Sequence, residues 1–547
     1  MLSNAFVEAT SIAVADASPI MNVMSRGRQF ASVFAVGSAV VCLYSMRQAD
    51  PDLWGYLTYG RLFVESGGLT SHDPFAYTSS GFQWTTFEYG AQVLLWVAYH
   101  LAGPSGLITL KCLVGGVALC CLSIAIRATT HKPSVWVPIF LLCTSAICRF
   151  FLFRPQLFTF AFFALFVAVL FQFLLRRRAP LWALPLVMLA WANVHGGFVA
   201  GLGALVLVIL LRASENLAAF GWRPSRLAEG TRRLWVALAA CTAATFINPL
   251  GPKLWVYVVT ELSHGTNRQY VVEWAPASLH RDAWSTIALT LITITLAVVG
   301  WAAQKHHTGS SPGPLPMYWV ASCVPLIAMS YLSIRHVPLA AIWTGPVIAW
   351  LASLLPDSLP QSAAFRRTWF VLRATAVLQV CVILAIVYGE PRPSIRVDGS
   401  TLGATHPCGA VGFLRSHRAG GNLYNPLWWG AYTTWKLYPS VRVSMDGRNV
   451  SLFSDEMVLE NLRFYLDEAS HVDIDAPSRY PTDFLLVPTD APVLRRVLSD
   501  SRWRRVYADA DAVLFERAGV SRTLADPSAP DRVPVTAQKP ACEAFLD

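Results

Sequence analysis

Apolar runs long enough to cross a membrane recur along most of this 547-residue chain. A bilayer core needs about 20 apolar residues per helix, and within it a helix pairs its own backbone groups. Charged residues make up only 14% of the chain, whereas soluble proteins carry about 25%. We therefore predict a polytopic α-helical membrane protein with about eleven spans, at residues 30–46, 106–126, 134–152, 155–175, 180–194, 197–212, 233–250, 284–303, 317–333, 337–355 and 368–388.

A shorter apolar run at residues 89–101 decides the topology, because counting it as a span would reverse every loop that follows. Basic residues gather in the cytoplasmic loops of membrane proteins. With the N-terminus in the cytoplasm and 89–101 left at the surface, all basic clusters lie inside, including Arg176 to Arg178. The pattern predicts a helix at 89–101 that lies on the outer surface, and a C-terminal domain outside the membrane.

The first outer loop, residues 47–105, opens with two acids, Asp50 and Asp52. The stretch "DLWGYLTYGRLFVESGG" follows, with apolar residues at helical spacing and a glycine pair at its end. We expect this juxtamembrane helix and the one at 89–101 to bracket the rest of the loop. The aromatic residues of the loop suit the headgroup level of the membrane, and they are Trp54, Tyr56, Tyr59, Trp84 and Tyr89.

The composition changes after the last apolar run. Residues 390–518 mix polar and apolar positions, and "VRVSMDGR", "DFLLVP" and "DAVLFER" have the composition of strands. Helices are predicted at 456–469 and 492–499. This region is expected to be a small extracytoplasmic α/β domain. Residues 1–29 are expected to be cytoplasmic, and the polar tail at 519–547 is expected to be disordered.

Cysteine placement argues against a disulfide framework. Nine of the eleven cysteines lie in or near apolar runs, where a free thiol packs as a small hydrophobic group. Cys408 and Cys542 lie outside them. No CxxC pair or Cys/His zinc spacing occurs. The net charge of +10 follows from the basic cytoplasmic loops, so no nucleic-acid partner is expected.

Polar groups that could carry chemistry gather at the outer ends of several spans. Basic side chains there could hold the oxygens of a lipid-linked phosphate at headgroup depth, and the candidates are Lys111, Arg149, Arg154, His195, Arg335 and His336. Carboxylates in the loop above could deprotonate an acceptor hydroxyl or hold a divalent metal. The catalytic candidates are Asp50, Asp52 and Glu88, with His72 and Asp73 as further loop candidates.

Each of these residues also has a structural interpretation. Asp50 and Asp52 could cap a helix, and Asp73 before Pro74 could form an Asx turn. Glu88 could complement a helix dipole. The arginines could extend to lipid headgroups, and His195 could be a polar turn residue. The convergence of the whole set, more than any member, indicates a functional site.

The outer loop resembles that of a known superfamily. "DPDLWGYLTYG", the helix ending "SGG" and "SHDPFAYTSSGFQWTTFEYGAQVLLWVAYHLAG" are similar to the first outer loop of GT-C fold glycosyltransferases. Within that superfamily the chain resembles a group of uncharacterised bacterial membrane proteins. They share the turn "WANVHGG" and a C-terminal "N…WWGAY…YP…DGR", here Asn425, Trp428 to Tyr432, Tyr438, Pro439 and Asp446 to Arg448. The resemblance extends from about residue 30 to 518.

The resemblance implies a location in the bacterial cytoplasmic membrane and a polyprenyl-phosphate-linked sugar donor. It implies a catalytic acid just after the first span, which here is Asp50 or Asp52. It establishes no cofactor. A divalent metal is possible, although the acid motifs that bind metal in oligosaccharyltransferases have no secure counterpart here. The segment "WWGAY" differs from the oligosaccharyltransferase motif "WWDYG", so recognition of a peptide acceptor is not implied.

Two other functions remain open at this stage. A lipid-linked glycan flippase or transporter would use a similar bundle, although transporters usually place polar groups near the bilayer midplane. A non-catalytic cell-envelope assembly protein could use the outer domain for docking. The donor sugar, the acceptor and the oligomeric state are not indicated by the sequence.

Overall fold

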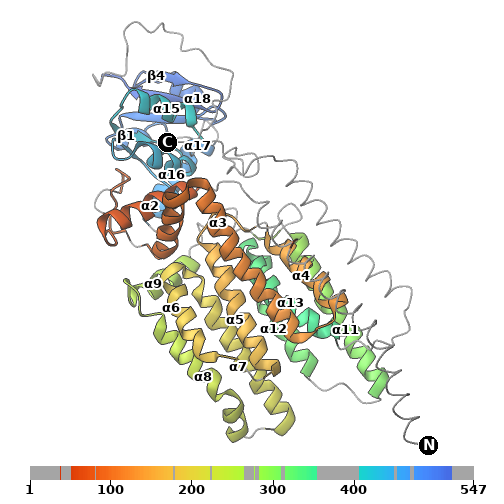
Figure 1. Ribbon diagram of the computed structural model, residues 1–547. Coiled ribbons are helices and arrows are strands. Elements are labelled where there is room, and N and C mark those ends of the chain that lie inside the picture. Colours follow the sequence, from red (N-terminus) through yellow and green to blue (C-terminus); the bar gives the residue numbers. More distant parts are fainter. Residues whose placement is uncertain are drawn as a thin grey trace, which may run out of the picture.

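The computed structural model describes residues 51–353 and 406–519, together with Gly37, apart from gaps at 80–81, 85, 149, 177–178, 222–223, 264–275, 278–282, 309–314, 449–451 and 468–472 (Figure 1). The predicted spans at 30–46 and 368–388 lie outside the described residues. So do the segment 1–29, the tail after residue 519, and two candidate site residues, Asp50 and Arg149.

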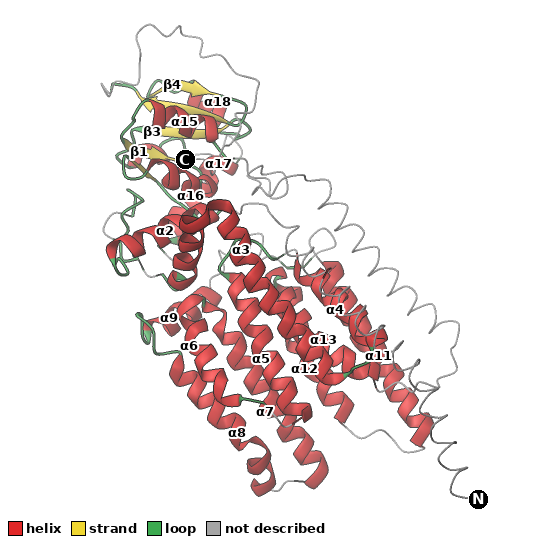
Figure 2. Ribbon diagram, in the orientation of Figure 1, coloured by secondary structure: helices red, strands yellow, loops and turns green. Residues whose placement is uncertain are grey.

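A helical bundle carries a separate α/β domain at one end, and the described strands are confined to that domain (Figure 2). The helices of the bundle are α4 (Pro133–Cys148), α5 (Gln156–Arg176), η1 (Leu181–Ala183), α6 (Leu184–Val194), η2 (Gly196–Phe198), α7 (Val199–Phe220), α8 (Pro224–Ala244), α9 (Lys253–Ser263), α11 (Ala283–Thr308), α12 (Leu315–Leu332), η4 (Ile334–His336) and α13 (Val337–Ser353). Two further helices, α2 (Leu53–Ser66) and α3 (Tyr89–Thr129), connect the bundle to the domain.

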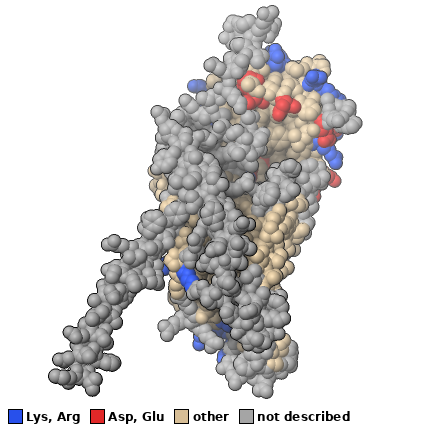
Figure 3. Space-filling view, turned by 90° about the vertical axis from the view of Figure 1, so that its right-hand side faces the viewer, with Lys and Arg blue, Asp and Glu red and all other residues tan. Residues whose placement is uncertain are grey.

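The described helices have the length and composition of membrane spans. Four are long and apolar enough to cross a bilayer, namely Tyr89–Thr129, Gln156–Leu175, Gly196–Leu217 and Ile334–Ser353. Shorter apolar helices run over Val135–Cys148, Leu181–Val194, Ser285–Val298 and Tyr318–Leu332. On the face in Figure 3, coloured acidic side chains lie only over the upper part, whereas basic ones also lie lower down. The total of eleven spans stays a prediction.

The two juxtamembrane helices occur where the sequence predicted them. Helix α2 ends at Gly67, whose φ of 68° is the left-handed conformation that glycine adopts easily. Helix α3 is interrupted at Ala102 and Gly103, which have non-helical backbone angles. The interruption separates the predicted surface helix at 89–101 from the predicted span that follows it. Figure 1 shows the helix bending at its upper end before it descends along the bundle.

The C-terminal domain is built on a five-stranded mixed sheet with the order β2-β1-β3-β5-β4. The strand β1 pairs in parallel with β2 and β3, whereas β5 pairs antiparallel with β3 and β4. The elements are α15 (Cys408–Ser416), β1 (Gly421–Tyr424), α16 (Leu427–Leu437), β2 (Val441–Val443), α17 (Asp455–Leu466), η6 (Ala476–Arg479), β3 (Phe484–Pro488), α18 (Leu494–Leu498), β4 (Trp503–Ala508) and β5 (Ala512–Arg517). The three predicted strands and both predicted helices are present. The sequence prediction missed β1, β4, α15 and α16.

The first outer loop and the C-terminal domain share cores. Leu53 and Leu57 of α2 lie in one hydrophobic cluster with Trp429 and Leu437 of α16. Backbone pairing continues the sheet into the loop, because Tyr77 N donates to Val443 O over 3.0 Å and Val443 N donates to Phe75 O over 3.3 Å. The loop and the domain therefore pack as a single unit.

The placement of the loop aromatics at headgroup level stays a prediction, but three of them are buried within the protein. Trp54, Tyr59 and Trp84 are 0%, 3% and 5% exposed. The ring of Trp54 packs edge-on against Tyr432 of α16. These rings fill the junction with the C-terminal domain because that domain, like a membrane, offers apolar surface and fixed polar partners for their N–H and O–H groups.

The cysteines divide by location. All seven described cysteines of the bundle are free, and they are Cys112, Cys120, Cys121, Cys143, Cys148, Cys241 and Cys323. Cys408, at the start of the C-terminal domain, is disulfide-bonded. The sequence prediction is therefore confirmed for the described cysteines of the bundle but did not anticipate this bond.

Candidate functional site

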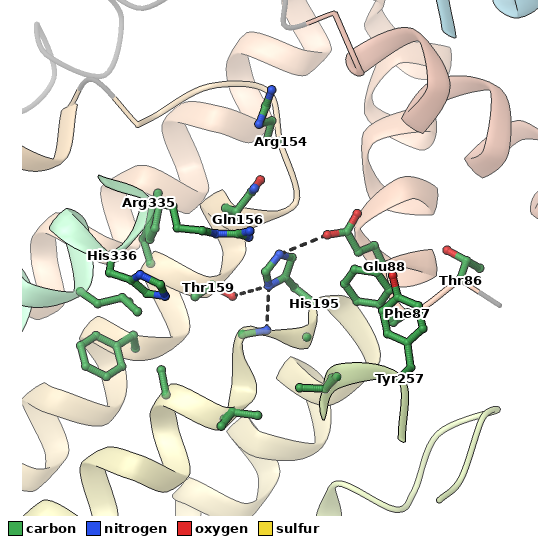
Figure 4. Close-up of a pocket in the computed structure, with 18 of the residues that line it drawn as sticks. Thr86, Phe87, Glu88, Arg154, Gln156, Thr159, His195, Tyr257, Arg335 and His336 are labelled. Atoms are coloured by element: carbon green, nitrogen blue, oxygen red, sulfur yellow. Dashed lines mark hydrogen bonds and ion pairs between the residues drawn. The ribbon is translucent and has the colours of Figure 1, made fainter. Parts of the chain in front are cut away.

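A cavity of about 640 Å³ lies at the junction of the bundle, the outer loop and the C-terminal domain. Apolar side chains of α5, α7 and α12 form its inner walls. Its polar lining comes from segments far apart in the chain, and it includes Asp52, Glu88, Arg154, Gln156, Thr159, His195, Arg335, His336 and Arg448. Five sequence candidates from separate segments, Glu88, Arg154, His195, Arg335 and His336, thus meet around one space (Figure 4). Asp52 also lines it.

Asp52 faces this cavity from the start of α2. It occupies the N-cap position, but its side chain makes no capping hydrogen bond. Its Oδ2 atom instead lies 3.5 Å from Nη2 of Arg154, and its side chain is 34% exposed. The carboxylate is therefore held by an arginine at the rim of the cavity, and the capping interpretation does not describe its interactions.

Arg154 lies in the short connection between α4 and α5. Its neighbour Phe153 is buried and packs under the ammonium of Lys111, which lies 4.9 Å from the ring centroid. Lys111 is 1% exposed and is absent from the described lining of the cavity. Its contact with Phe153 supports the connection that presents Arg154.

His195 lies at the centre of a chain of hydrogen bonds. Trp191 Nε1 donates to Thr159 Oγ1 over 2.9 Å, and Thr159 Oγ1 lies 2.8 Å from His195 Nδ1. The backbone N–H of Gly197 donates to the same Nδ1 over 2.9 Å. Since indole and backbone N–H groups can only donate, Nδ1 accepts and the proton resides on Nε2. That nitrogen lies 3.2 Å from Oε1 of Glu88.

The pairing between His195 and Glu88 is loose. Their 3.2 Å separation is short enough for an ion pair, yet Nε2 has no aligned hydrogen-bond partner among the described residues. The His195 side chain is only 6% exposed and that of Glu88 is 14% exposed. The structure therefore orients a buried N–H and a carboxylate toward the cavity without saturating either.

Arg335 and His336 come from η4, the single turn between α12 and α13. Figure 4 shows both side chains on the same side of the cavity as Gln156, with His195 between them and Glu88. Glu88 adjoins Phe87, whose ring stacks on Tyr257 at a centroid distance of 4.4 Å. The site thus has a cationic side and a side with a carboxylate and aromatic rings.

The two other loop candidates lie away from the cavity. His72 is exposed and contacts Ser71. Asp73 is buried and accepts hydrogen bonds from the backbone N–H groups of Phe75 and Ala76, as expected for an Asx-type turn. It also pairs with Arg448, whose Nη1 lies 2.7 Å from Oδ1.

Sequence reasoning missed several residues that line the cavity. Gln156 and Thr159 lie in the first turn of α5, and Ala431 and Gly447 come from the C-terminal domain. The motifs "WWGAY" and "DGR" contain the latter two, so the sequence did single out these segments. The sequence raised a contact between "DGR" and an acceptor positioned by the outer domain, but it did not indicate that this segment lies against Asp52.

No cluster of three or more His, Cys, Asp or Glu side chains suited to a metal ion occurs among the described residues. Of the carboxylates that line the cavity, Asp52 contacts Arg154 and Glu88 contacts His195.

Comparison with known proteins identifies the fold. No protein-family model matches the chain, and no curated protein matches its sequence. The structure of archaeal oligosaccharyltransferase AglB from Archaeoglobus fulgidus, in complex with an inhibitory peptide and a dolichol-phosphate, matches 84% of this chain and 69% of that one, with a TM-score of 0.54 and 10% identity. ArnT from Cupriavidus metallidurans bound to undecaprenyl phosphate matches 91% of this chain and 98% of that one, with a TM-score of 0.47 and 13% identity.

At these identities the likeness concerns the fold alone, and the AglB match carries it. The resemblance to GT-C glycosyltransferases that the sequence motifs indicated is confirmed at the level of the fold.

Proposed function

We propose that this chain is a membrane glycosyltransferase that moves a sugar from a polyprenyl-phosphate or pyrophosphate donor to an acceptor at the outer face of the membrane. One observation carries the proposal: carboxylates, arginines and histidines from separate segments line one cavity where the bundle meets the outer loop. AglB, which shares the fold, is an oligosaccharyltransferase and its structure contains a dolichol-phosphate.

The cationic side of the cavity suits the phosphate of the donor. Arg154 and Arg335 both line it. A single guanidinium group can donate hydrogen bonds to two oxygens of a phosphate. His336 and Gln156 lie beside them. Positive groups at this place would stabilise the charge that develops on the departing phosphate. The apolar walls formed by α5, α7 and α12 would accommodate the adjoining prenyl units.

Asp52 would act as the general base. In the proposed step its carboxylate takes the proton of an acceptor hydroxyl, and the hydroxyl oxygen forms a bond to the anomeric carbon of the sugar. The bond from that carbon to the phosphate oxygen breaks, and the phosphate leaves with the electron pair. Asp50, two residues earlier, is the other base candidate from the sequence.

Two features support an outer-face location for the C-terminal domain. Basic residues gather in cytoplasmic loops, and their distribution in this chain predicts that the C-terminal domain lies on the opposite, outer side. Cys408 in that domain is disulfide-bonded. Structural disulfides persist in oxidising compartments and are rare in the cytosol. In a bacterium this corresponds to the outer face of the cytoplasmic membrane.

The direct test is turnover of a panel of labelled polyprenyl-phosphate sugars by the purified protein. The variant Asp52→Asn should lose turnover by about 10²- to 10⁴-fold, while its affinity for undecaprenyl phosphate stays unchanged. Glu65→Gln is the matched control, because Glu65 is an exposed carboxylate of the same helix that pairs with Arg61. Asp50→Asn, measured alongside, decides between the two acids.

Phosphate binding has its own test. Arg335→Met should weaken binding of undecaprenyl phosphate by roughly 10- to 100-fold, as expected for loss of a charged hydrogen bond. Arg233→Met, at an exposed arginine of α8, should leave it unchanged. If the wild-type protein binds none of the donors, a flippase or an assembly protein becomes the better description. Binding and lipid translocation without any sugar transfer would favour the flippase.

A further inference from the structure

The turn formed by Asp446, Gly447 and Arg448 is anchored by a buried ion cluster. Arg448 donates to both oxygens of Asp446, over 2.8 Å from Nε and 2.7 Å from Nη2. Its Nη1 reaches Asp73 of the outer loop over 2.7 Å. The Arg448 side chain is only 6% exposed, and both carboxylates are 0% exposed.

Aromatic rings enclose the same guanidinium. Its central carbon lies 4.7 to 5.3 Å from the ring centroids of Trp84, Tyr59 and Phe75, all from the first outer loop. Burial by itself lowers the pKa of Arg448, but Asp446, Tyr59 and Asp73 together raise it above its ordinary value. Arg448 therefore remains a cation and fixes the turn to the outer loop.

Helix α16 packs directly against the back of this turn. A Cβ atom added at Gly430 would lie 2.0 Å from the carbonyl oxygen of Met445 and 2.7 Å from the Cα atom of Asp446. Both contacts are with backbone, so α16 and the turn touch without a side chain between them. The turn has little freedom to move away from the outer loop.

The front of the turn meets Asp52. A Cβ atom added at Gly447 would lie 2.2 Å from Oδ1 of Asp52, 3.2 Å from its Cγ and 3.9 Å from its Oδ2, and these are its three nearest atoms. The Asp52 carboxylate is thus held between Gly447 on one side and Arg154 on the other, whose Nη2 lies 3.5 Å from Oδ2.

We infer that the Asp446–Gly447–Arg448 turn of the C-terminal domain is a positioning element of the cavity: Gly447 sets where the Asp52 carboxylate lies. The consequence for turnover rests on the proposed function. The C-terminal domain then completes the reactive site, because it holds in place a carboxylate that belongs to the first outer loop. Gly447 acts through Asp52 and needs no contact with the substrate.

The contact offers a selective perturbation. In Gly447→Ala the added methyl group overlaps the end of a side chain, which can rotate, and not the backbone. The fold should accommodate the change while the Asp52 carboxylate is displaced. Misplacing a reacting group by about 1 Å can cost roughly 100-fold in rate.

The experiment compares Gly447→Ala with the wild-type protein in the full chain. We expect kcat for sugar transfer to fall at least about tenfold, with KM for the donor and Kd for undecaprenyl phosphate within about twofold of wild type. The midpoint of thermal unfolding should stay near the wild-type value. Gly412→Ala is the matched control, because Gly412 lies on α15 of the same domain with nothing within 4 Å of its added Cβ.

The outcomes separate the inference from the proposed function. Wild-type turnover with an unchanged kcat in Gly447→Ala overturns the inference and leaves the proposed function intact. A Gly447→Ala variant whose KM, Kd and unfolding midpoint change together with kcat overturns it too, because the turn is then only structural. If the wild-type protein transfers no sugar, the proposed function fails and the inference fails with it.

Discussion

Two charged clusters lie side by side in this protein, and they are paired very differently. The cluster of Arg448, Asp446 and Asp73 is enclosed by aromatic rings, and its ions meet at 2.7 Å. In the adjoining cavity Arg154 lies 3.5 Å from Asp52, and His195 lies 3.2 Å from Glu88. Removing one member of a closely paired buried cluster leaves an uncompensated buried charge, whereas charged groups that line a cavity can meet a ligand. The comparison separates charges that are enclosed within the fold from charges that line the cavity.

The largest expected loss of stability comes from breaking the cluster of Arg448, Asp446 and Asp73. Arg448→Met leaves Asp446 and Asp73 buried without their cation, which should cost about 3–5 kcal/mol of folding free energy. The loss should appear as a lower midpoint in thermal unfolding of the purified protein. Arg442→Met, at an exposed arginine of β2, is the control and should change stability by less than about 0.5 kcal/mol. Equal midpoints for the two variants would contradict the structural role of Arg448.

The next largest loss of stability is expected where α16 packs against the Asp446–Gly447–Arg448 turn. Gly430→Ala places a methyl group against the backbone of Met445 and Asp446, which cannot rotate away as a side chain can. Overpacking of this kind should cost about 3 kcal/mol. The measurement compares the midpoints of thermal unfolding of Gly430→Ala and Gly447→Ala. Only the Gly430 variant should be destabilised. A stable Gly430→Ala protein would show that α16 and the turn separate easily.

A smaller loss of stability is expected when the hydrogen-bond chain that orients His195 is broken. Thr159→Val keeps the shape of the side chain but removes the acceptor of the Trp191 indole N–H. An unpaired buried donor costs about 1–3 kcal/mol. Turnover should also fall, because His195 loses one of the groups that fix its ring. Thr159→Ser retains the hydroxyl and should have the stability and turnover of the wild-type protein. A loss of either in Thr159→Ser would show that the methyl group of Thr159 matters instead of its hydroxyl.

The smallest expected change in stability is at Glu88. Since its pairing with His195 is loose, Glu88→Gln should alter folding free energy by no more than about 0.5 kcal/mol. Turnover should nevertheless fall at least about tenfold, because the carboxylate faces the cavity. Unfolding and turnover are measured on the same preparation. A marked loss of stability would place Glu88 with the structural charges and remove the contrast between the two clusters.

The local elements of this fold followed from sequence patterns. Apolar periodicity and glycine placement predicted α2, and strand-like composition predicted three strands of the C-terminal domain. The length of the apolar run and the distribution of basic residues separated the helix at 89–101 from the span that follows it. The missed elements are short or ambiguous on their own. The strand β1 has four residues and gains its neighbours from β2 and β3, so its identity depends on residues far along the chain.

The candidate site was predictable as a set but not residue by residue. Arg154, His195 and Arg335 were singled out by their position at the ends of spans, and the structure brings them together around one cavity. Lys111 shares that position in the sequence, yet its ammonium packs on Phe153. Position at the end of a span sets the depth of a residue in the membrane. It does not set the direction in which the side chain points.

The sequence by itself determined a helical membrane protein with an acid-bearing loop after the first predicted span and an α/β domain near the C-terminus, because hydrophobic length and periodicity are local properties of the chain. Only the tertiary structure decided that Gly447 meets Asp52 and that Arg448 meets Asp73. These partners are nearly four hundred residues apart. Which of them touch is decided by how α2, α16 and β2 pack on one another, and such packing depends on the shapes of whole surfaces that no short stretch of sequence specifies.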